Sequence, residues 1–136
     1  MFKVTGRQLR EMLRYMMREE NFAEHSEFYQ VPATLRMRYD RTKGDFDYFT
    51  YCGKEVGKEI ADTAIFTVGI QNYHFQNIES FLNISHKTLM QLQKPRSVAT
   101  SCQDILLEYF REHEWLDAKV DGRMEIIGHG AAYWAI

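Results

Sequence analysis

The sequence has little cysteine or proline and lacks long apolar runs. It has two cysteines, Cys52 and Cys102, and two prolines among 136 residues. Two cysteines in unrelated contexts do not make a disulfide framework, so both are expected to be reduced thiols. No run approaches the ~20 apolar residues of a membrane span, and no apolar signal-peptide stretch follows Met1. We therefore expect a cytoplasmic protein without a membrane partner.

Signatures of common catalytic chemistry are also missing. The sequence has no Gly-x-Ser-x-Gly, Walker or His-Glu-x-x-His motif, and its five histidines form no i, i+4 pair. Neither a metal ion nor another cofactor is therefore predicted. His129, between Gly128 and Gly130, is the one candidate catalytic residue, because a general acid or base on a turn could approach a substrate with Glu125 or Tyr133 nearby. A polar turn residue is the simpler interpretation.

The overall composition is that of an ordinary globular domain, with 45% hydrophobic and 26% charged residues. Aromatic residues make up 14%, which suggests aromatic surface beyond what a core needs. The net charge of −2 conceals an asymmetry: residues 1–44 carry nine Lys/Arg and six Asp/Glu, whereas residues 45–136 carry eight and thirteen. Such polarity could orient the protein on a partner or support self-association.

The N-terminal half predicts a helix followed by a hairpin. Thr5 and Gln8 form a capping box that opens a helix over about 6–20. Apolar–polar alternation over 35–40, turn residues over 41–44 and a second run over 46–51 predict two paired strands. An even-residue loop would place Leu35, Met37, Tyr39, Phe46, Tyr48 and Thr50 on one face and Arg36, Arg38, Asp47, Phe49 and Tyr51 on the other.

The C-terminal half predicts further helices and then strands. Residues 60–70 fit a helix or a buried strand, and we favour the helix. The other expected elements are a helix start at 53–59, a helix over 75–93 that Ser85 restarts and Pro95 ends, a helix from Cys102 to about Leu116 capped by Ser101, a hairpin at Asp121-Gly122 and a last segment over 131–136. Residues 1–136 should thus form a single compact α+β domain, in which an antiparallel sheet (central hairpin plus C-terminal meander) packs with about four helices.

The sharpest pattern in the chain is a row of arginines on the first helix. Arg7, Arg10, Arg14 and Arg18 form a stripe opposite the apolar side chains of Leu9, Met12, Leu13 and Met16. An outward row of guanidinium groups can meet phosphates or a carboxylate-rich protein, and it can equally be a solvated face. Neighbouring glutamates such as Glu11 could neutralise it by i, i+4 pairing.

The hairpin adds a second set of candidate binding residues. Arg36 and Arg38 share their expected face with Phe49 and Tyr51, and single-stranded nucleic acid is bound by combining cationic grooves with aromatic platforms. The favoured hypothesis is a small non-enzymatic interaction protein, of the inhibitor or adaptor type, that presents both arginine sets to an acidic protein surface or a nucleoprotein complex. The alternatives are a single-stranded nucleic-acid-binding module and a small hydrolase or transferase using His129. Self-association as a homodimer is a further option.

Overall fold

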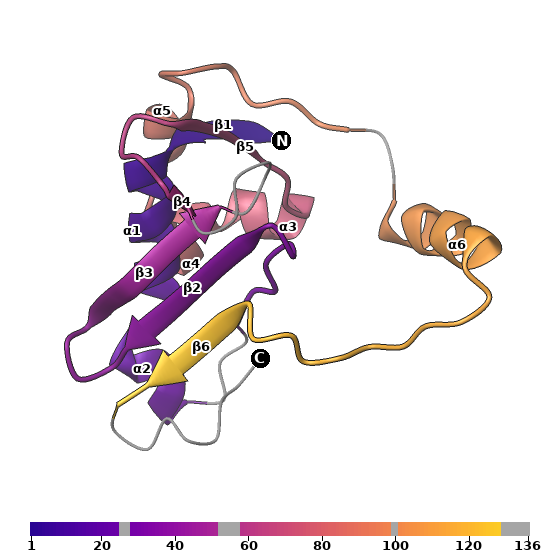
Figure 1. Cartoon of the computed structure of the whole chain (residues 1–136). Helices are drawn as coiled ribbons and strands as arrows, with labels where there is room; N and C mark the ends of the chain where they lie inside the picture. Colours follow the sequence, from indigo (N-terminus) through magenta and orange to yellow (C-terminus); the bar gives the residue numbers. More distant parts are fainter. Residues whose placement is uncertain (25–27, 52–57, 99–100, 129–136) are drawn as a thin grey trace.

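The chain folds into short strands and helices, with strands β2 to β5 in one run and helices α3 to α6 in the next (Figure 1). The computed structural model describes residues 1–24, 28–51, 58–98 and 101–128. In chain order the elements are β1 (Phe2–Thr5), α1 (Gly6–Met16), α2 (Glu19–Ala23), β2 (Leu35–Asp40), β3 (Asp45–Tyr51), β4 (Lys58–Glu59), β5 (Ile65–Val68), α3 (Asn72–Gln76), α4 (Ile78–Leu82), α5 (His86–Leu89), α6 (Cys102–Glu112) and β6 (Met124–Ile127). The predicted α+β class is confirmed.

The strands form two sheets. The larger has the order β4-β3-β2-β6, and the smaller pairs β1 with β5. All pairings are antiparallel except that of β6 with β2, in which Met124 lies opposite Met37. The expected hairpin at Asp121-Gly122 and the purely antiparallel meander are therefore wrong, and residues 131–136 lie outside the described ranges. A parallel partner needs a long connection rather than a tight turn, and the chain between β2 and β6 comprises residues 41–123.

The first helix begins as the sequence predicts. Thr5 Oγ1 accepts a hydrogen bond from Gln8 N at 3.1 Å, and Gln8 Oε1 accepts one from Thr5 N at 2.9 Å, which completes the capping box. The helix stops at Met16 rather than Glu20, because Arg18 is extended at ψ 149° and starts the short helix α2. The continuous helix over 6–20 is therefore two helices with a bend between them.

Within residues 60–70, for which we favour a helix, Ile65–Val68 form strand β5 and no helix is present. β5 pairs with β1 in a register that sets Phe2 opposite Val68 and Thr5 opposite Ile65. A strand before the first helix was not expected, so its partner was not recognised either. Of the helix start at 53–59, only Lys58–Glu59 is described, and it is strand β4.

The expected helix over 75–93 is divided into three short helices. Asn83, at φ 52°, ends α4 in the left-handed conformation. Ser85 then starts α5, and its Oγ accepts a hydrogen bond from Thr88 N at 3.1 Å. The predicted break and the role of Ser85 as a cap are both confirmed.

The central hairpin forms where the sequence predicts it, but one face of β3 is assigned wrongly. Tyr39 pairs with Phe46 and Arg38 with Tyr48, so Asp47 is an additional residue on β3. Such a bulge reverses the side-chain alternation beyond it. Phe49 and Tyr51 consequently lie on the same face as Met37 and Leu35, and not beside the arginines as expected.

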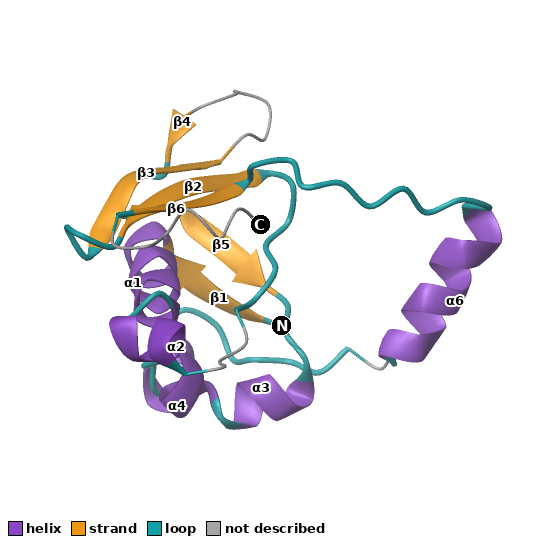
Figure 2. Cartoon of the chain, turned by 90° about the horizontal axis from the view of Figure 1, so that it is seen from below, coloured by secondary structure: helices purple, strands orange, loops and turns teal. Residues whose placement is uncertain are grey.

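The core lies where α1 packs under the larger sheet. Helices α1, α2 and α4 lie on one face of that sheet (Figure 2). The buried side of α1, which includes Met12 and Met16, belongs to the same hydrophobic cluster as Met37, Phe49 and Met124 of the strands. Packing α1 in this way turns its opposite side, with the arginine row, toward the sheet edge and the surface.

Gly6→Ala should destabilise this arrangement. Gly6 is buried at the start of α1, where an added methyl group would overlap the carbonyl oxygen of Ala61 and lie 2.7 Å from Ile60 Cγ2. Overpacking of this kind costs about 1–3 kcal/mol, and urea denaturation should show a loss of that size. Gly69→Ala is the matched control, because its nearest neighbour is Met1 Cγ at 3.9 Å. Equal losses in both variants would contradict the steric explanation.

Candidate interaction surface

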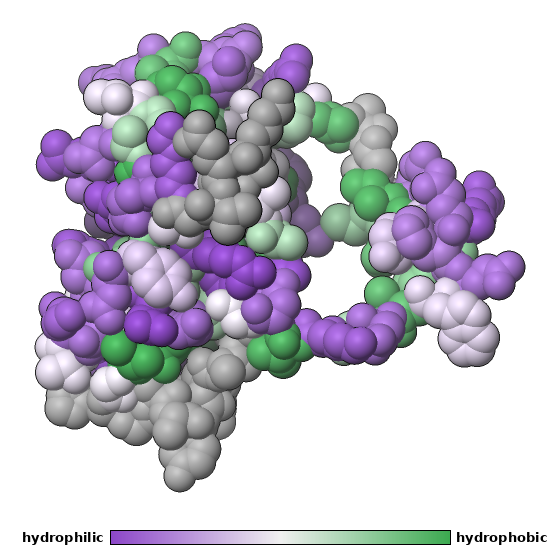
Figure 3. All heavy atoms as spheres, viewed as in Figure 1, coloured by the Kyte–Doolittle hydropathy of each residue, from purple (hydrophilic) through white to green (hydrophobic). Residues whose placement is uncertain are grey.

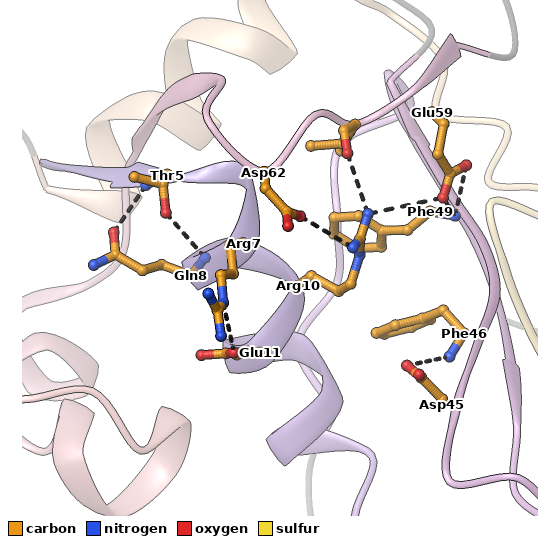
Figure 4. A network of polar contacts seen from close by, with 11 residues as sticks. Thr5, Arg7, Gln8, Arg10, Glu11, Asp45, Phe46, Phe49, Glu59 and Asp62 are labelled. Atoms are coloured by element: carbon orange, nitrogen blue, oxygen red, sulfur yellow. Dashed lines mark hydrogen bonds and ion pairs between the residues drawn. The ribbon is translucent and has the colours of Figure 1, made fainter.

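Arg10, at the centre of the predicted stripe, is held by the protein's own carboxylates. Its Nη1 donates to Asp62 Oδ1 at 3.2 Å and its Nη2 to the carbonyl oxygen of Ile60 at 3.1 Å (Figure 4). Glu59 Oε1 is 3.8 Å from Nη2, and the guanidinium lies 5.7 Å from the centroid of the Phe49 ring. Arg10 therefore joins α1 to residues 59–62 and is largely used inside the fold.

The other arginines of the row have different surroundings. Arg7 forms an exposed i, i+4 pair with Glu11 at 3.3 Å, as the sequence suggests. Arg18 lies 4.1 Å from the centroid of the Tyr15 ring and donates to the carbonyl oxygen of Tyr15. Arg14 is exposed on the surface of α1. The row is therefore not one continuous cationic stripe: Arg7 and Arg14 are its solvent-facing members.

Arg36 and Arg38 lie on the face of the sheet opposite the core residues of β2. Arg38 Nε is 2.8 Å from Glu125 Oε2, and its guanidinium lies 5.3 Å from the ring centroid of Tyr48. The pKa of Arg38 is raised, chiefly by its hydrogen bond to Glu125. Burial and the Glu125 charge raise the pKa of Tyr48. This face is thus a paired arginine–carboxylate–tyrosine group.

The two aromatic candidates do not form a stacking platform. Phe49 is 0% exposed and belongs to the core, so it cannot reach a partner. Tyr51 is 43% exposed but makes an edge contact with Phe66, at a ring separation of 5.6 Å. The bulge at Asp47 is the physical reason, because it turns both rings away from the arginine face.

The histidine candidate, His129, lies outside the described residues. A different histidine, His74, lines a cavity of about 370 Å³ with Arg18 and Asn21, and its Nδ1 is 2.8 Å from the hydroxyl of Tyr29. The sequence pattern does not reveal this pair, because its members are 45 residues apart. Within the described ranges, no group of three or more His, Cys, Asp or Glu side chains is arranged to hold a metal ion. No helix in those ranges is long and apolar enough to cross a membrane.

The largest uncovered surface belongs to residues 101–121, which we call the arm. The arm consists of α6 and the extended segment after it, and all of its residues are exposed (Figures 1 and 2). Ser101 Oγ accepts a hydrogen bond from Asp104 N at 3.1 Å, which confirms the predicted cap. The helix ends at Glu112 rather than near Leu116, and it stands away from the core instead of packing on it.

Helix α6 separates apolar from charged side chains. Cys102, Ile105, Leu106, Tyr109 and Phe110 share one side, and Asp104, Glu108, Arg111 and Glu112 share the other. Leu106 and Phe110 are 54% and 49% exposed, and Trp115 in the following segment is 88% exposed. Figure 3 shows open gaps between α6 and the body, with apolar surface on the side of α6 that faces them. A contiguous apolar surface of this kind marks a contact site in a folded protein.

A groove of about 890 Å³ lies where the arm leaves the body. The body lines it with mostly apolar side chains and the Arg96 guanidinium, principally Met1, Ile70, Tyr73, Phe75, Arg96 and Val98. From α6 only Cys102 and Ile105 reach it, and Gln71 Nε2 donates to Cys102 Sγ at 3.0 Å. The first turn of α6 therefore touches the groove, and the rest of its apolar side does not.

Both ends of the arm are fixed to the body. Before it, Arg96 N donates to the carbonyl oxygen of Met1 at 2.9 Å. At its other end, Arg36 Nη1 donates to the carbonyl oxygen of Asp121 at 3.1 Å, and Arg123 Nη1 donates to that of Val31 at 2.9 Å. Arg123 also forms an ion pair with Asp121, with 2.6 Å between Nη2 and Oδ2. Hydrogen bonds at Arg96 and at Asp121 therefore hold the chain to the body before and after α6.

Comparison with known proteins finds no matching family model, no similar curated protein and no similar solved structure. The chain's own surfaces must therefore indicate its function. Among them, the exposed side of α6 is the feature that sequence reasoning did not single out. Its amphipathic spacing was visible, but a helix that packs on its own core has the same spacing.

Arg10→Gln should destabilise the protein, because the variant loses charge-assisted hydrogen bonds at a partly buried position. The side chain is 30% exposed, so we expect a loss of about 1–2 kcal/mol in the free energy of unfolding by urea denaturation. The control is Arg14→Gln, on the exposed side of the same helix, which should change stability by less than about 0.5 kcal/mol. Similar losses in both variants would show that Arg10 has no special structural role.

Asp121 should titrate at unusually low pH. Its hydrogen bonds with the Arg123 side chain lower its pKa from 3.8 to about 2. The folded chain thus keeps this carboxylate charged when the unfolded chain is protonated, so its stabilising contribution is present above pH 3.8 and is lost as the pH falls toward 2. NMR titration of the Asp121 carboxyl carbon measures this pKa. In Arg123→Gln it should rise toward its ordinary value, and an unchanged pKa would disprove the assignment.

Proposed function

We propose that this protein is an interaction protein that acts by occupying a partner's surface, with the apolar side of α6 as its main contact element. The carrying observation is that Leu106, Tyr109 and Phe110 are 42–54% exposed on a well-formed helix, and that segments on either side of this helix are hydrogen-bonded to the body at Arg96 and Asp121. A pre-formed helix loses little conformational entropy on binding, so its apolar contacts contribute fully to affinity. An adaptor or inhibitor needs no more than such a surface.

The residue types on the arm support a protein as the partner. Aromatic side chains dominate the energetics of protein interfaces, and the arm presents Tyr109, Phe110 and Trp115. An amphipathic helix whose apolar residues recur at i, i+3 and i+4 is a common element that docks into a groove of another protein. Trp115, which is 88% exposed, would be among the residues most completely buried on binding.

The charges favour a protein over a nucleic acid. The arm holds Asp104, Glu108, Glu112, Glu114, Asp117 and Asp121 against Arg111 and Lys119, so it would repel a phosphate backbone. The arginine surface is also weaker than its sequence suggests, because Arg10 and Arg38 are paired with carboxylates. Exposed arginines remain at Arg7, which pairs with Glu11, and at Arg14, and they offer a second and smaller cationic surface to an acidic protein.

Phe110→Asp should abolish partner binding without unfolding the protein, because Phe110 is 49% exposed and lies on the apolar side of α6. The matched control is Arg111→Gln, which changes the net charge by the same amount on the opposite side. Tagged wild type and both variants would be used for affinity purification from a cell extract, with and without nuclease. A stoichiometric protein retained by the wild type and Arg111→Gln but lost in Phe110→Asp is expected. Equal recovery in all three would refute the proposed role of α6.

A further inference from the structure

The surface area of the chain indicates what covers the arm. A folded monomer of 16.2 kDa is expected to expose about 7,500 Å², whereas this chain exposes 9798 Å². The excess, about 2,300 Å², is within the range of about 1,000–2,500 Å² that each subunit of an intimate homodimer buries. The molecule thus exposes more surface than a compact monomer of its mass, by an amount that one dimer interface could cover.

The groove beside the arm has the chemistry to receive a helix such as α6. Among its described lining residues, Arg96 and the N-terminal ammonium group of Met1 carry positive charge, and the others are mostly apolar. The opposite pattern is found on α6, whose apolar side is bordered, toward the charged side of the helix, by the carboxylates of Glu108 and Glu112. An α6 helix placed in the groove would bury its apolar side and bring carboxylates toward the Arg96 guanidinium.

In a single chain, the apolar side of α6 does not fill the groove. Its own first turn contacts the groove through Cys102 and Ile105, and the helix then leads away from it, with Leu106 and Phe110 left exposed. The groove retains a volume of about 890 Å³. A second copy supplies the same groove and the same helix, and reciprocal placement about a two-fold axis covers both.

We propose that two copies of this chain exchange arms, so that the apolar side of α6 in each copy fills the groove between Ile70, Phe75 and Val98 of the other. This inference rests on the proposed function, since it names the partner of the same helix side. Because the exchange is reciprocal, the assembly closes at two copies. The arm remains attached to its own chain at both ends and reaches across the two-fold axis as a loop.

Mutually complementary variants test the exchange directly. Phe110→Asp disables the arm, and Val98→Asp disables the groove at a side chain that is 54% exposed and not needed for folding. Arg111→Gln and Met90→Asp are the matched controls, the latter at an exposed apolar residue outside the groove lining. Mass would be measured by light scattering during size-exclusion chromatography over a range of concentrations.

We expect wild type and both controls to have twice the monomer mass. Each disabling variant should dimerise at least about 30-fold more weakly per affected interface, the change expected on loss of one interface hot spot. An equimolar mixture of Phe110→Asp and Val98→Asp should form a mixed dimer, because the intact arm of one chain meets the intact groove of the other. Neither variant alone can form such an interface.

Two results would overturn the arm exchange. Wild type with monomer mass at all concentrations excludes a second copy as the partner, and a dimer unaffected by either variant places the interface elsewhere. If the wild type is a monomer, the proposed function still holds when affinity purification recovers another protein with the wild type but not with Phe110→Asp. If Phe110→Asp changes neither mass nor protein recovery, both proposals fail.

Discussion

Burial of one side of α1 beneath the larger sheet is the contact on which the rest of the structure depends. It brings Met12 and Met16 into one cluster with Phe49, and the adaptable methionine side chains fill the space between a helix and a twisted sheet. Because α1 lies there, Arg10 reaches both the Phe49 ring and Asp62, and it joins α1 to the edge of the larger sheet beside β4. The same placement fixes β1, which leads directly into α1 and pairs with β5.

The features that could be predicted from the sequence are those that depend on interactions between residues close together in the chain. The caps at Thr5, Ser85 and Ser101 each depend on a hydrogen bond across three residues, and all three are present. The hairpin was likewise recognisable from its alternation and turn. In contrast, β5 forms a strand because β1 is beside it, and the bulge at Asp47 follows from packing that no local pattern records.

In the candidate site, too, the sequence predicts what depends on neighbouring residues and not what depends on contacts between distant ones. Spacing alone placed Arg10 on the polar side of a helix, but its partner Asp62 is 52 residues away, so its structural role was invisible. The amphipathic pattern of α6 was also correct. What the pattern cannot show is whether the apolar side meets the protein's own core or another surface, because both satisfy the same spacing.

The pairing of β6 with β2 has a consequence for the order of folding. The Arg38–Glu125 bond within it joins residues 87 apart, and contacts over such separations close late because the loop between them must first be restricted. The hairpin and α1 use shorter separations and can form before it. Until β6 arrives, β2 is therefore a sheet edge with unpaired backbone groups, open to any extended segment nearby. We therefore expect the pairing of β6, formed late, to be the step that covers this edge.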